Sequence, residues 1–293
     1  MSLKQAQNHG VPFSAGYIRY RDRSRSRKIY SGRREEPMLE AGFHYEIGEY
    51  KCIIFSDGTL VNQDSENEEV FGLNCLFINS GNHKILIDTG CGDGFQSTAG
   101  RLAKNLEAEG IRCSDIDKII FTHGHIDHVG GSFDSQGSSI FPNARYITSE
   151  REWECWVTQP ESSELQSMFF SAARKNLLPI QNQFDLVKDD AEVLPGIKLI
   201  AAPGHTQGII MVNISSNEKR LLCIGDIVHS QLEFIHPEYL SLFDVTPAQA
   251  LNTRARILSD VAKSGILVFA CHFPFPGLGY ITHNKGIFTW QPI

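Results

Sequence analysis

The sequence predicts an α/β fold in which two mixed β-sheets stack against each other and helices cover their outer faces. The order of the expected elements is the main reason: β-hairpins, a helix, a strand and further helices are followed by a second set of hairpins, a helix and a strand. The composition agrees, because 41% hydrophobic and 21% charged residues in a chain of 293 are typical of a globular protein with ample material for a core.

Hairpins dominate the first half of the expected core. Residues 44–60 are typical of extended chain, with a glycine turn and then an Asp-Gly turn, and the polar residues 62–69 predict a loop. Residues 72–90 predict two apolar strands joined by Ser-Gly-Asn-His, which is a hairpin signal. A helix over 97–109, supported by two leucines four residues apart, and a buried strand over 117–121 complete this half.

The second half also combines helices with strands. Residues 149–178 are rich in aromatic residues and helix formers, which predicts two helices. Residues 208–226 predict a hairpin with a polar turn, and the apolar run 266–272 predicts a final buried strand that ends in a histidine.

The clearest helix signal lies at residues 247–263. Thr246 is expected to cap the helix, Pro247 suits its first turn, and Gln249 completes a capping box. Gly265 marks its end. Its apolar stripe consists of Leu251, Leu258 and Val261.

The segment THGHIDH directly follows the predicted strand KIIF and concentrates three histidines and an aspartate. On extended chain His123 and His125 point the same way, and Gly124 between them lets other groups approach the backbone closely. Asp127 and His128, after the chain turns, can aim at a neighbouring point. Neutral imidazoles and a carboxylate are ligands for zinc and other first-row divalent metals, so the cluster predicts a metal site.

Three further ligand candidates follow apolar runs elsewhere in the chain. They are His205 in LIAAPGHT, Asp226 in LLCIGD and His272 in LVFACH. Taken singly, each has a structural alternative: a turn histidine, a helix-capping aspartate and a buried polar residue. Jointly they supply the ligands of two metals, namely His123, His125 and His205 for one, Asp127, His128 and His272 for the other, and Asp226 as the bridge.

These residues resemble the metallo-β-lactamase superfamily, whose H-x-H-x-D-H signature is complete here. The resemblance continues through ILIDTG, PGHTQG, the Gly-Asp pair at 225–226 and His272, and it covers about residues 44–290. It implies a four-layer αββα sandwich with a dinuclear metal site at one edge of the sheets. It also implies that Asp88 forms a hydrogen bond to a metal ligand and so orients it. The alternative is that Asp88 only forms a turn.

The C-terminal part is similar to one branch of this superfamily. The segments GDIVHS, FDVTPAQA and HFPFPGLGY are similar to methyl parathion hydrolase, whose branch sits close to the quorum-quenching N-acyl-homoserine lactonases. Those lactonases commonly carry a tyrosine shortly after the bridging aspartate. This chain has Ile227, Val228 and His229 there.

The resemblance implies two divalent metal ions as cofactors, with Zn²⁺ as the first candidate and Mn, Fe or Co as alternatives. A hydroxide bridging the metals is expected to attack a small ester, lactone or organophosphate triester. Asp127 and Asp226 are the expected catalytic residues, and Asp127 is a candidate proton acceptor. The alternatives are a phosphodiesterase or nuclease that uses the same site, and a non-catalytic metal-binding protein.

Four residues are candidates for the substrate pocket. Phe273 and Phe275 flank a proline directly after His272, and Trp153 lies in a segment expected to cover the metals. Core packing is the alternative for these aromatic residues. His229 is a candidate for an outer contact or a substrate contact, with a plain surface histidine as the alternative.

The charge of the chain is unevenly distributed. Residues 1–34 carry nine Lys and Arg against one acid, a net charge of +8, so the rest carries about −15 of the total of −7. We expect a basic extension over residues 1–40, either an oligomerisation arm or partly disordered, and a single catalytic domain over 41–293. The acidic body disfavours nucleic acid, and a homodimer agrees with the resemblance and the extension.

The remaining observations concern the compartment. The longest apolar runs, such as GILVFA, are too short to cross a bilayer, and the N-terminus lacks a hydrophobic targeting segment. The seven cysteines are scattered and form no C-x-x-C pair, which favours reduced thiols. We therefore expect a cytoplasmic protein that acts on a small molecule and does not bind membranes.

Overall fold

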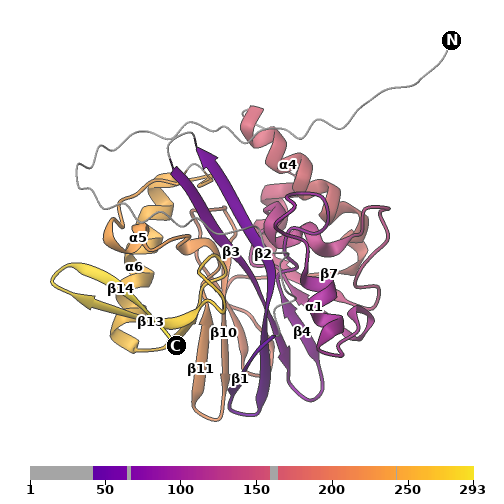
Figure 1. Cartoon of the computed structure of the whole chain (residues 1–293), viewed down its shortest axis with the longest axis horizontal. Coiled ribbons are helices and arrows are strands. Elements are labelled where there is room, and N and C mark those ends of the chain that lie inside the picture. The colour runs from indigo at the N-terminus through magenta and orange to yellow at the C-terminus, as the bar shows by residue number, and fades with distance from the viewer. Residues whose placement is uncertain (1–41, 65–66, 159–163, 242) are drawn as a thin grey trace, which may run out of the picture.

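In this computed structural model the chain is described over residues 42–64, 67–158, 164–241 and 243–293 (Figure 1). Within these residues, two seven-stranded sheets pack face to face, and helices cover the outer face of each. The predicted αββα sandwich with two mixed sheets is therefore confirmed. The predicted basic extension over residues 1–40 lies outside the described residues.

The first sheet has its strands in chain order, antiparallel from β1 to β4 and parallel from β4 to β7. Its strands are β1 (Phe43–Ile47), β2 (Tyr50–Asp64), β3 (Asn67–Asn79), β4 (Lys84–Ile87), β5 (Lys118–Ile120), β6 (Arg145–Ser149) and β7 (Phe184–Val187).

The second sheet also follows chain order, and all its neighbouring strands are antiparallel except β11 and β12, which are parallel. Its strands are β8 (Glu192–Leu194), β9 (Ile197–Ala201), β10 (Ile210–Ser216), β11 (Lys219–Cys223), β12 (Leu267–Phe269), β13 (Leu278–Asn284) and β14 (Ile287–Pro292).

Helices and single helical turns connect these strands. The α-helices are α1 (Leu102–Ala108), α2 (Ile126–Val129), α3 (Glu150–Trp153), α4 (Glu164–Leu177), α5 (Leu232–Ile235) and α6 (Pro247–Ser264). The shorter turns are η1 (Cys113–Asp115), η2 (Gly130–Ser132), the π-helical η3 (Glu154–Thr158), η4 (Leu178–Gln183) and η5 (Gly225–Ile227). No helix in the described part of the chain combines the length and the apolar composition that a membrane span requires.

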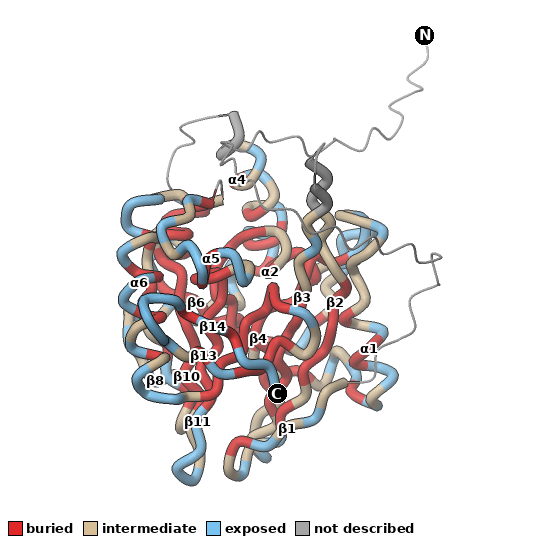
Figure 2. The backbone as a smooth tube through the Cα atoms, turned by 60° about the vertical axis from the view of Figure 1, so that its left-hand side comes forward, coloured by how far each residue is buried: buried red, intermediate tan, exposed pale blue. Residues whose placement is uncertain are grey.

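Three apolar clusters account for the four layers. One lies between the sheets and contains Ile54 of the first sheet and Val212 of the second. A second contains Leu106 of α1, which packs on the outside of the first sheet, and a third contains Leu258 of α6 with Val268 of β12. Buried positions follow the strands and the inner faces of the helices, whereas the hairpin tips and the outward faces of the helices are exposed (Figure 2).

Two predictions about β2 and β3 are wrong. The Asp57-Gly58 pair forms no chain reversal but a bulge inside β2, where the register with β3 shifts between Ser56 and Gly58. The polar residues 62–69 are not a free loop, because the β2–β3 ladder continues to the pair Asp64 and Asn67. Strand pairing uses main-chain groups, so a polar sequence does not end the ladder. Residues 65 and 66 lie outside the described residues.

The helix predicted at 247–263 is present as α6, but its predicted capping box is wrong. The helix runs from Pro247 to Ser264, and Gly265, whose φ is +60°, is its C-cap. The side chain of Thr246 makes no capping hydrogen bond; its main-chain oxygen accepts from the amide of Gln249 instead. Of the predicted apolar stripe, Leu258 and Val261 are buried and Leu251 is only half-buried.

Candidate metal centre

The histidine-rich loop begins where β5 ends. His125 has extended backbone angles, φ −66° and ψ 153°, and directly precedes α2. The loop therefore presents His123 and His125 before the helix, and Asp127 and His128 from the single turn of α2. This change from extended chain to helix divides the four side chains between two neighbouring points.

Gly124 separates the two histidines for a packing reason. A Cβ atom at this position would lie 2.5 Å from the ring of Trp156, so only glycine leaves room for that ring. The indole of Trp156 is buried and lies edge-on to the imidazole of His125, with 5.2 Å between ring centroids. The glycine of the motif thus allows an aromatic side chain to support the loop.

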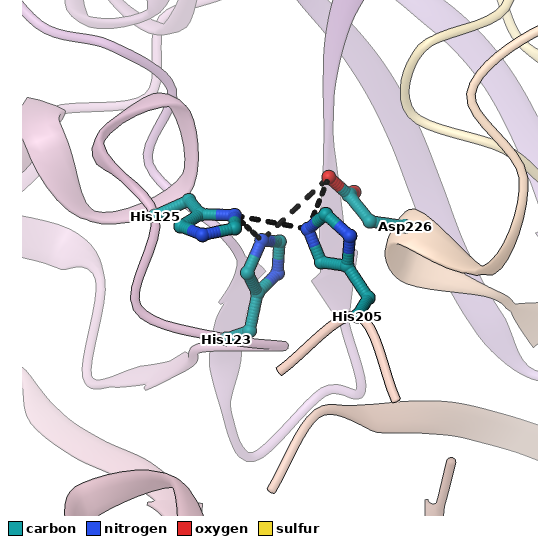
Figure 3. Close-up of side chains that lie close together, drawn as sticks. All are labelled: His123, His125, His205 and Asp226. Carbon is teal, nitrogen blue, oxygen red and sulfur yellow. Dashed lines mark hydrogen bonds and ion pairs between the residues drawn. The ribbon is translucent and has the colours of Figure 1, made fainter. Parts of the chain in front are cut away.

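Three imidazoles and one carboxylate converge in the first group of candidate ligands (Figure 3). Nδ1 of His125 lies 2.9 Å from Nε2 of His123 and 2.9 Å from Nε2 of His205. Oδ2 of Asp226 lies 3.6 Å from the same atom of His123 and 3.4 Å from that of His205. The structure therefore brings together the set that the sequence predicted for one metal.

The second group shares Asp226 with the first. Oδ1 of Asp226 lies 3.2 Å from Nε2 of His128, and Oδ2 lies 3.1 Å from Nε2 of His272. Oδ2 of Asp127 lies 3.7 Å from Nε2 of His128 and 3.5 Å from Nε2 of His272. Cys271, which the sequence reasoning did not propose as a ligand, also borders this group, and its thiol donates to Oδ1 of Asp226 at 3.4 Å.

The donor set fits divalent first-row metals. Nδ1 of His125 faces two other ring nitrogens. Each ring nitrogen offers either one hydrogen or one lone pair, so Nδ1 of His125 can form a hydrogen bond with only one of the two. Burial lowers the pKa of His123 and of His125 well below the usual value, which keeps both rings in the neutral form that binds metal. Nε2 of His128 is buried without a hydrogen-bond partner and points at the second group. These observations favour a cation at each group.

Asp88 lies directly behind the second group. Its Oδ2 accepts from Nδ1 of His128 and from Oγ1 of Thr122, each at 2.8 Å, and its Oδ1 accepts from the amide of Thr122. Burial lowers the pKa of His128, but the carboxylates of Asp226, Asp88 and Asp127 outweigh it and raise the value well above normal. This position therefore attracts positive charge. Asp88 also has φ +60°, so it serves the turn as well.

Two other ligand candidates have partners that the sequence reasoning did not identify. Oδ1 of Asp244, a buried carboxylate after α5, lies 3.0 Å from Nδ1 of His205. Nδ1 of His272 donates to the main-chain oxygen of Gly72 in β3, also at 3.0 Å. Such partners fix the ring orientation of a metal-binding histidine. Neither contact has a local sequence signal, because both partners are distant in the chain.

His229 stands beside both groups on the cavity side. Its Nε2 lies 3.4 Å from Oδ2 of Asp226, and its ring stacks on that of His272 with 5.6 Å between centroids. Oε1 of Glu233 lies 3.3 Å from Nδ1 of His229 and 2.8 Å from the buried guanidinium of Arg254. Arg254 was not predicted, and it ties the His229 segment to α6.

An aromatic-walled cavity opens above the two groups. His125, Asp127, His205, Asp226, His229 and His272 contribute to its floor and sides. The aromatic part of its wall consists of Phe71, Phe95, Phe169, Tyr239 and Phe243. Among the described residues, no lysine or arginine lines it. The cavity therefore combines an apolar wall with a floor of candidate metal ligands.

Of the four predicted pocket residues, only His229 lines this cavity, and the other three lie elsewhere. The chain turns directly after His272, which buries Phe273 against Phe234 and Trp290 in the core under α6. Phe275 packs against the core between the sheets. Trp153 contacts Phe184 on the outer side of the first sheet, with 4.7 Å between ring centroids.

The fold and the paired ligand groups define a class: an αββα protein built to hold two metal ions at one edge of its sheets. A family model described as "Metallo-beta-lactamase superfamily" matches residues 69–272, which is more than half of the chain. The chain belongs to the metallo-beta-lactamase superfamily.

Curated relatives and solved structures are similar to this chain. The N-acyl homoserine lactonase of Bacillus thuringiensis is 26% identical over 173 residues, which cover 59% of this chain and 62%, less than two thirds, of that relative. An N-acyl homoserine lactonase of a Bacillus species is 25% identical and covers 78% of this chain and 92% of its own.

Two solved structures extend over more of the chain. The dizinc quorum-quenching lactonase AidC, in complex with a product, has a TM-score of 0.82 and 26% identity and covers 87% of this chain and 98% of its own. AbOPH, described as a hydrolase in the beta lactamase superfamily, has a TM-score of 0.80 and 28% identity and covers 88% of this chain and 99% of its own.

Proposed function

We propose that the protein is a dinuclear metal-dependent hydrolase that opens small, uncharged lactones. The observation that carries the proposal is the position of Asp226, whose two oxygens face both ligand groups at the floor of an aromatic-walled cavity. When bound, two divalent cations supply an activated water and polarise the substrate carbonyl. Zn²⁺ is the first candidate. The proposed ligands are His123, His125, Asp127, His128, His205, Asp226 and His272.

The side chains around the cavity have separate roles in this proposal. The aromatic wall excludes water and receives the apolar part of the substrate. The carboxylate of Asp127 reaches the cavity with 14% of its side chain exposed. It accepts a proton after the attack on the carbonyl and returns it to the ring oxygen as the C–O bond breaks. His229, held at Nδ1 by Glu233, contacts a substrate oxygen with Nε2.

The cavity favours uncharged substrates over phosphodiesters. Phosphodiester backbones need cationic contacts, whereas the described lining contains the carboxylates of Glu69 and Glu233 and no lysine or arginine. The relatives in B. thuringiensis and the AidC structure are lactonases, which supports lactones ahead of linear esters and organophosphate triesters. A nuclease that uses the same site is the weaker hypothesis.

Metal analysis combined with a hydrolysis panel tests the proposal. The purified protein, loaded with Zn, Mn or Co, would be assayed on lactones, aryl esters, phosphotriesters, phosphodiesters and a cephalosporin. We expect about two metals per chain and the highest kcat/KM on a lactone. Two bound metals without turnover of any substrate would contradict the enzyme proposal and favour a metal-binding protein. A preference for phosphodiesters would favour the nuclease hypothesis instead.

A further inference from the structure

A buried carboxylate outside the proposed ligand set joins the two loops that supply the first ligand group. Glu152 of α3 is 2% exposed, and each of its oxygens accepts two hydrogen bonds. Oε1 accepts from the amide of Gly124 at 2.8 Å and from the indole of Trp156 at 2.5 Å. Oε2 accepts from the hydroxyl of Thr206 at 2.6 Å and from the amide of Gly208 at 3.0 Å.

Three of these four donors, all except Trp156 of η3, belong to the two loops that supply the first ligand group. Gly124 stands between His123 and His125 on the loop after β5, whereas Thr206 directly follows His205 on the loop after β9. Glu152 thus joins a loop of the first sheet to a loop of the second. The ring nitrogens that these loops bring together, Nδ1 of His125 and Nε2 of His205, are 2.9 Å apart.

A side chain with two acceptor oxygens suits this position, because each oxygen receives two donors. Burial raises the pKa of Glu152, and the four donors oppose that effect. An amide in its place would offer one acceptor and would direct its own N–H groups at two donors. The backbone of α3 adds to the connection, because Ser149 accepts from the amide of Glu152 at 3.0 Å and donates to the main-chain oxygen of Gly208 at 2.8 Å.

The second ligand group is held by different contacts. Nδ1 of His128 is bonded to Asp88, and Nδ1 of His272 is bonded to the main-chain oxygen of Gly72. Among the hydrogen bonds of the described residues, none joins Glu152 to the rings of the second group. Loss of the Glu152 carboxylate therefore affects one group directly and leaves the supports of the other in place.

We propose that Glu152 is a positioning residue that sets the distance between the two loops of the first metal group and thereby determines the affinity of that metal. The inference rests on the dinuclear centre proposed above. It predicts that removing the carboxylate releases one metal of the two. Residues that orient metal ligands from behind typically change affinity 10- to 100-fold, and we expect an effect of about that size.

Zinc competition with a chromogenic chelator tests the inference without relying on catalysis. The variant Glu152→Gln would be titrated beside wild type and two reference variants, His205→Ala for the first metal and His272→Ala for the second. We expect Glu152→Gln to resemble His205→Ala: about one zinc held at wild-type affinity and the other weakened about 10- to 100-fold. Thr206→Val, which removes one donor, should shift the same metal less, and Thr206→Ser should restore it.

A stability control separates positioning from general damage. Leu106→Ala leaves a cavity under α1, a helix that supplies none of the proposed ligands, and should lower Tm while both zinc affinities remain unchanged. If Glu152→Gln does not fold, the variants Thr206→Val and Thr206→Ser test the positioning role in the same titration. If Glu152→Gln binds two zinc ions with the affinities of wild type, the positioning role is overturned but the proposed function is not. The same holds for Thr206→Val where Glu152→Gln does not fold. Wild type that binds no zinc would overturn both this inference and the proposed function.

Discussion

The two sheets contribute to the metal centre in different ways. The first sheet supplies four of the seven proposed ligands from one loop, between His123 and His128. The second supplies His205, Asp226 and His272 from three loops that follow β9, β11 and β12. The spacing of the first set is fixed by the local backbone, whereas the second set depends on how strands distant in sequence pack side by side.

The supports of the ligands show the same contrast. His128 is held by Asp88, at the end of the neighbouring strand β4. His272 instead bonds to the oxygen of Gly72 in the first sheet, and the amide of Gly72 bonds back to the oxygen of His272 at 2.9 Å. His272 of the second sheet therefore relies on a contact with the first sheet, and substitutions in the two sheets should have distinguishable effects.

Asp226→Ala should have the largest effect, because Asp226 is the one proposed ligand that faces both groups. We expect both metals to be lost and kcat/KM to fall about 1,000-fold or more, since metal catalysis contributes several kcal/mol to transition-state stabilisation. Metal content and turnover would be measured on the same preparation. Retained activity would show that the ligand assignment is wrong.

Two buried carboxylates, Asp57 in the first half of the chain and Glu233 in the second, should make the stability of the fold change with pH in opposite directions. Burial raises the pKa of Asp57, in β2, from 3.8 to about 6, despite main-chain donors that include Cys91 and Leu102. The folded state then holds its proton longer than the unfolded state, so stability should fall by roughly 3 kcal/mol as pH rises from about 4 to 6. Burial raises the pKa of Glu233 too, but His229 and Arg254 lower it from 4.5 to about 2.

The Glu233 contribution is therefore present above about pH 4.5 and is lost, by roughly 3 kcal/mol, as pH falls toward 2. Urea unfolding of the metal-free protein between pH 2 and 7 would measure both slopes. Asp57→Asn should flatten the change between pH 4 and 6, and Glu233→Gln should flatten the acidic one. An unchanged profile in either variant would contradict the assignment for that residue.

The sequence predicts the local half of the centre better than the non-local half. The H-x-H-x-D-H loop carries its geometry in its own spacing, and the strand ends that deliver His205, Asp226 and His272 are recognisable as apolar runs. The supports are not recognisable. Glu152, Asp244 and Arg254 contact groups far away in the chain, so no local pattern distinguishes them from ordinary helix or loop residues.

The errors have the same origin. Asp57-Gly58 is a turn signal when only its neighbours are considered, but the Asp57 side chain accepts from Cys91, Gly100 and Leu102, and these contacts stabilise a bulge within a long strand. Phe273 follows a proposed ligand directly, yet the turn after His272 directs it into the core. In each case a contact formed only in the folded chain decides the outcome.

Asp88→Asn and Asp244→Asn compare the supports of the two groups. Asp88 orients His128 and Asp244 orients His205, so each variant should weaken mainly its own metal, by about 10- to 100-fold. Chelator competition would show which metal is affected when the variants are compared with His128→Ala and His205→Ala. Equal weakening of both metals by either variant would show that the two groups do not act separately.

The smallest expected effects concern the cavity wall. There, a substitution in the half of the fold that contains the first sheet should change substrate binding, whereas one in the half that contains the second sheet should change catalysis. Phe169, from the first half, gives an apolar contact that is the same in the ground state and the transition state, so Phe169→Ala should raise KM about tenfold with little change in kcat. In the proposed function, His229 from the second half contacts the substrate oxygen whose charge changes most during ring opening.

His229→Phe keeps a ring of similar shape and should lower kcat about 3- to 10-fold, the loss of one hydrogen bond, with little change in KM. Lactones with short and long acyl chains provide the control: the Phe169 effect should grow with chain length, whereas the His229 effect should not, because His229 lies beside Asp226 rather than along the apolar wall. If His229→Phe changed only KM, the histidine would be part of the wall and the proposed contact to the reacting oxygen would be wrong.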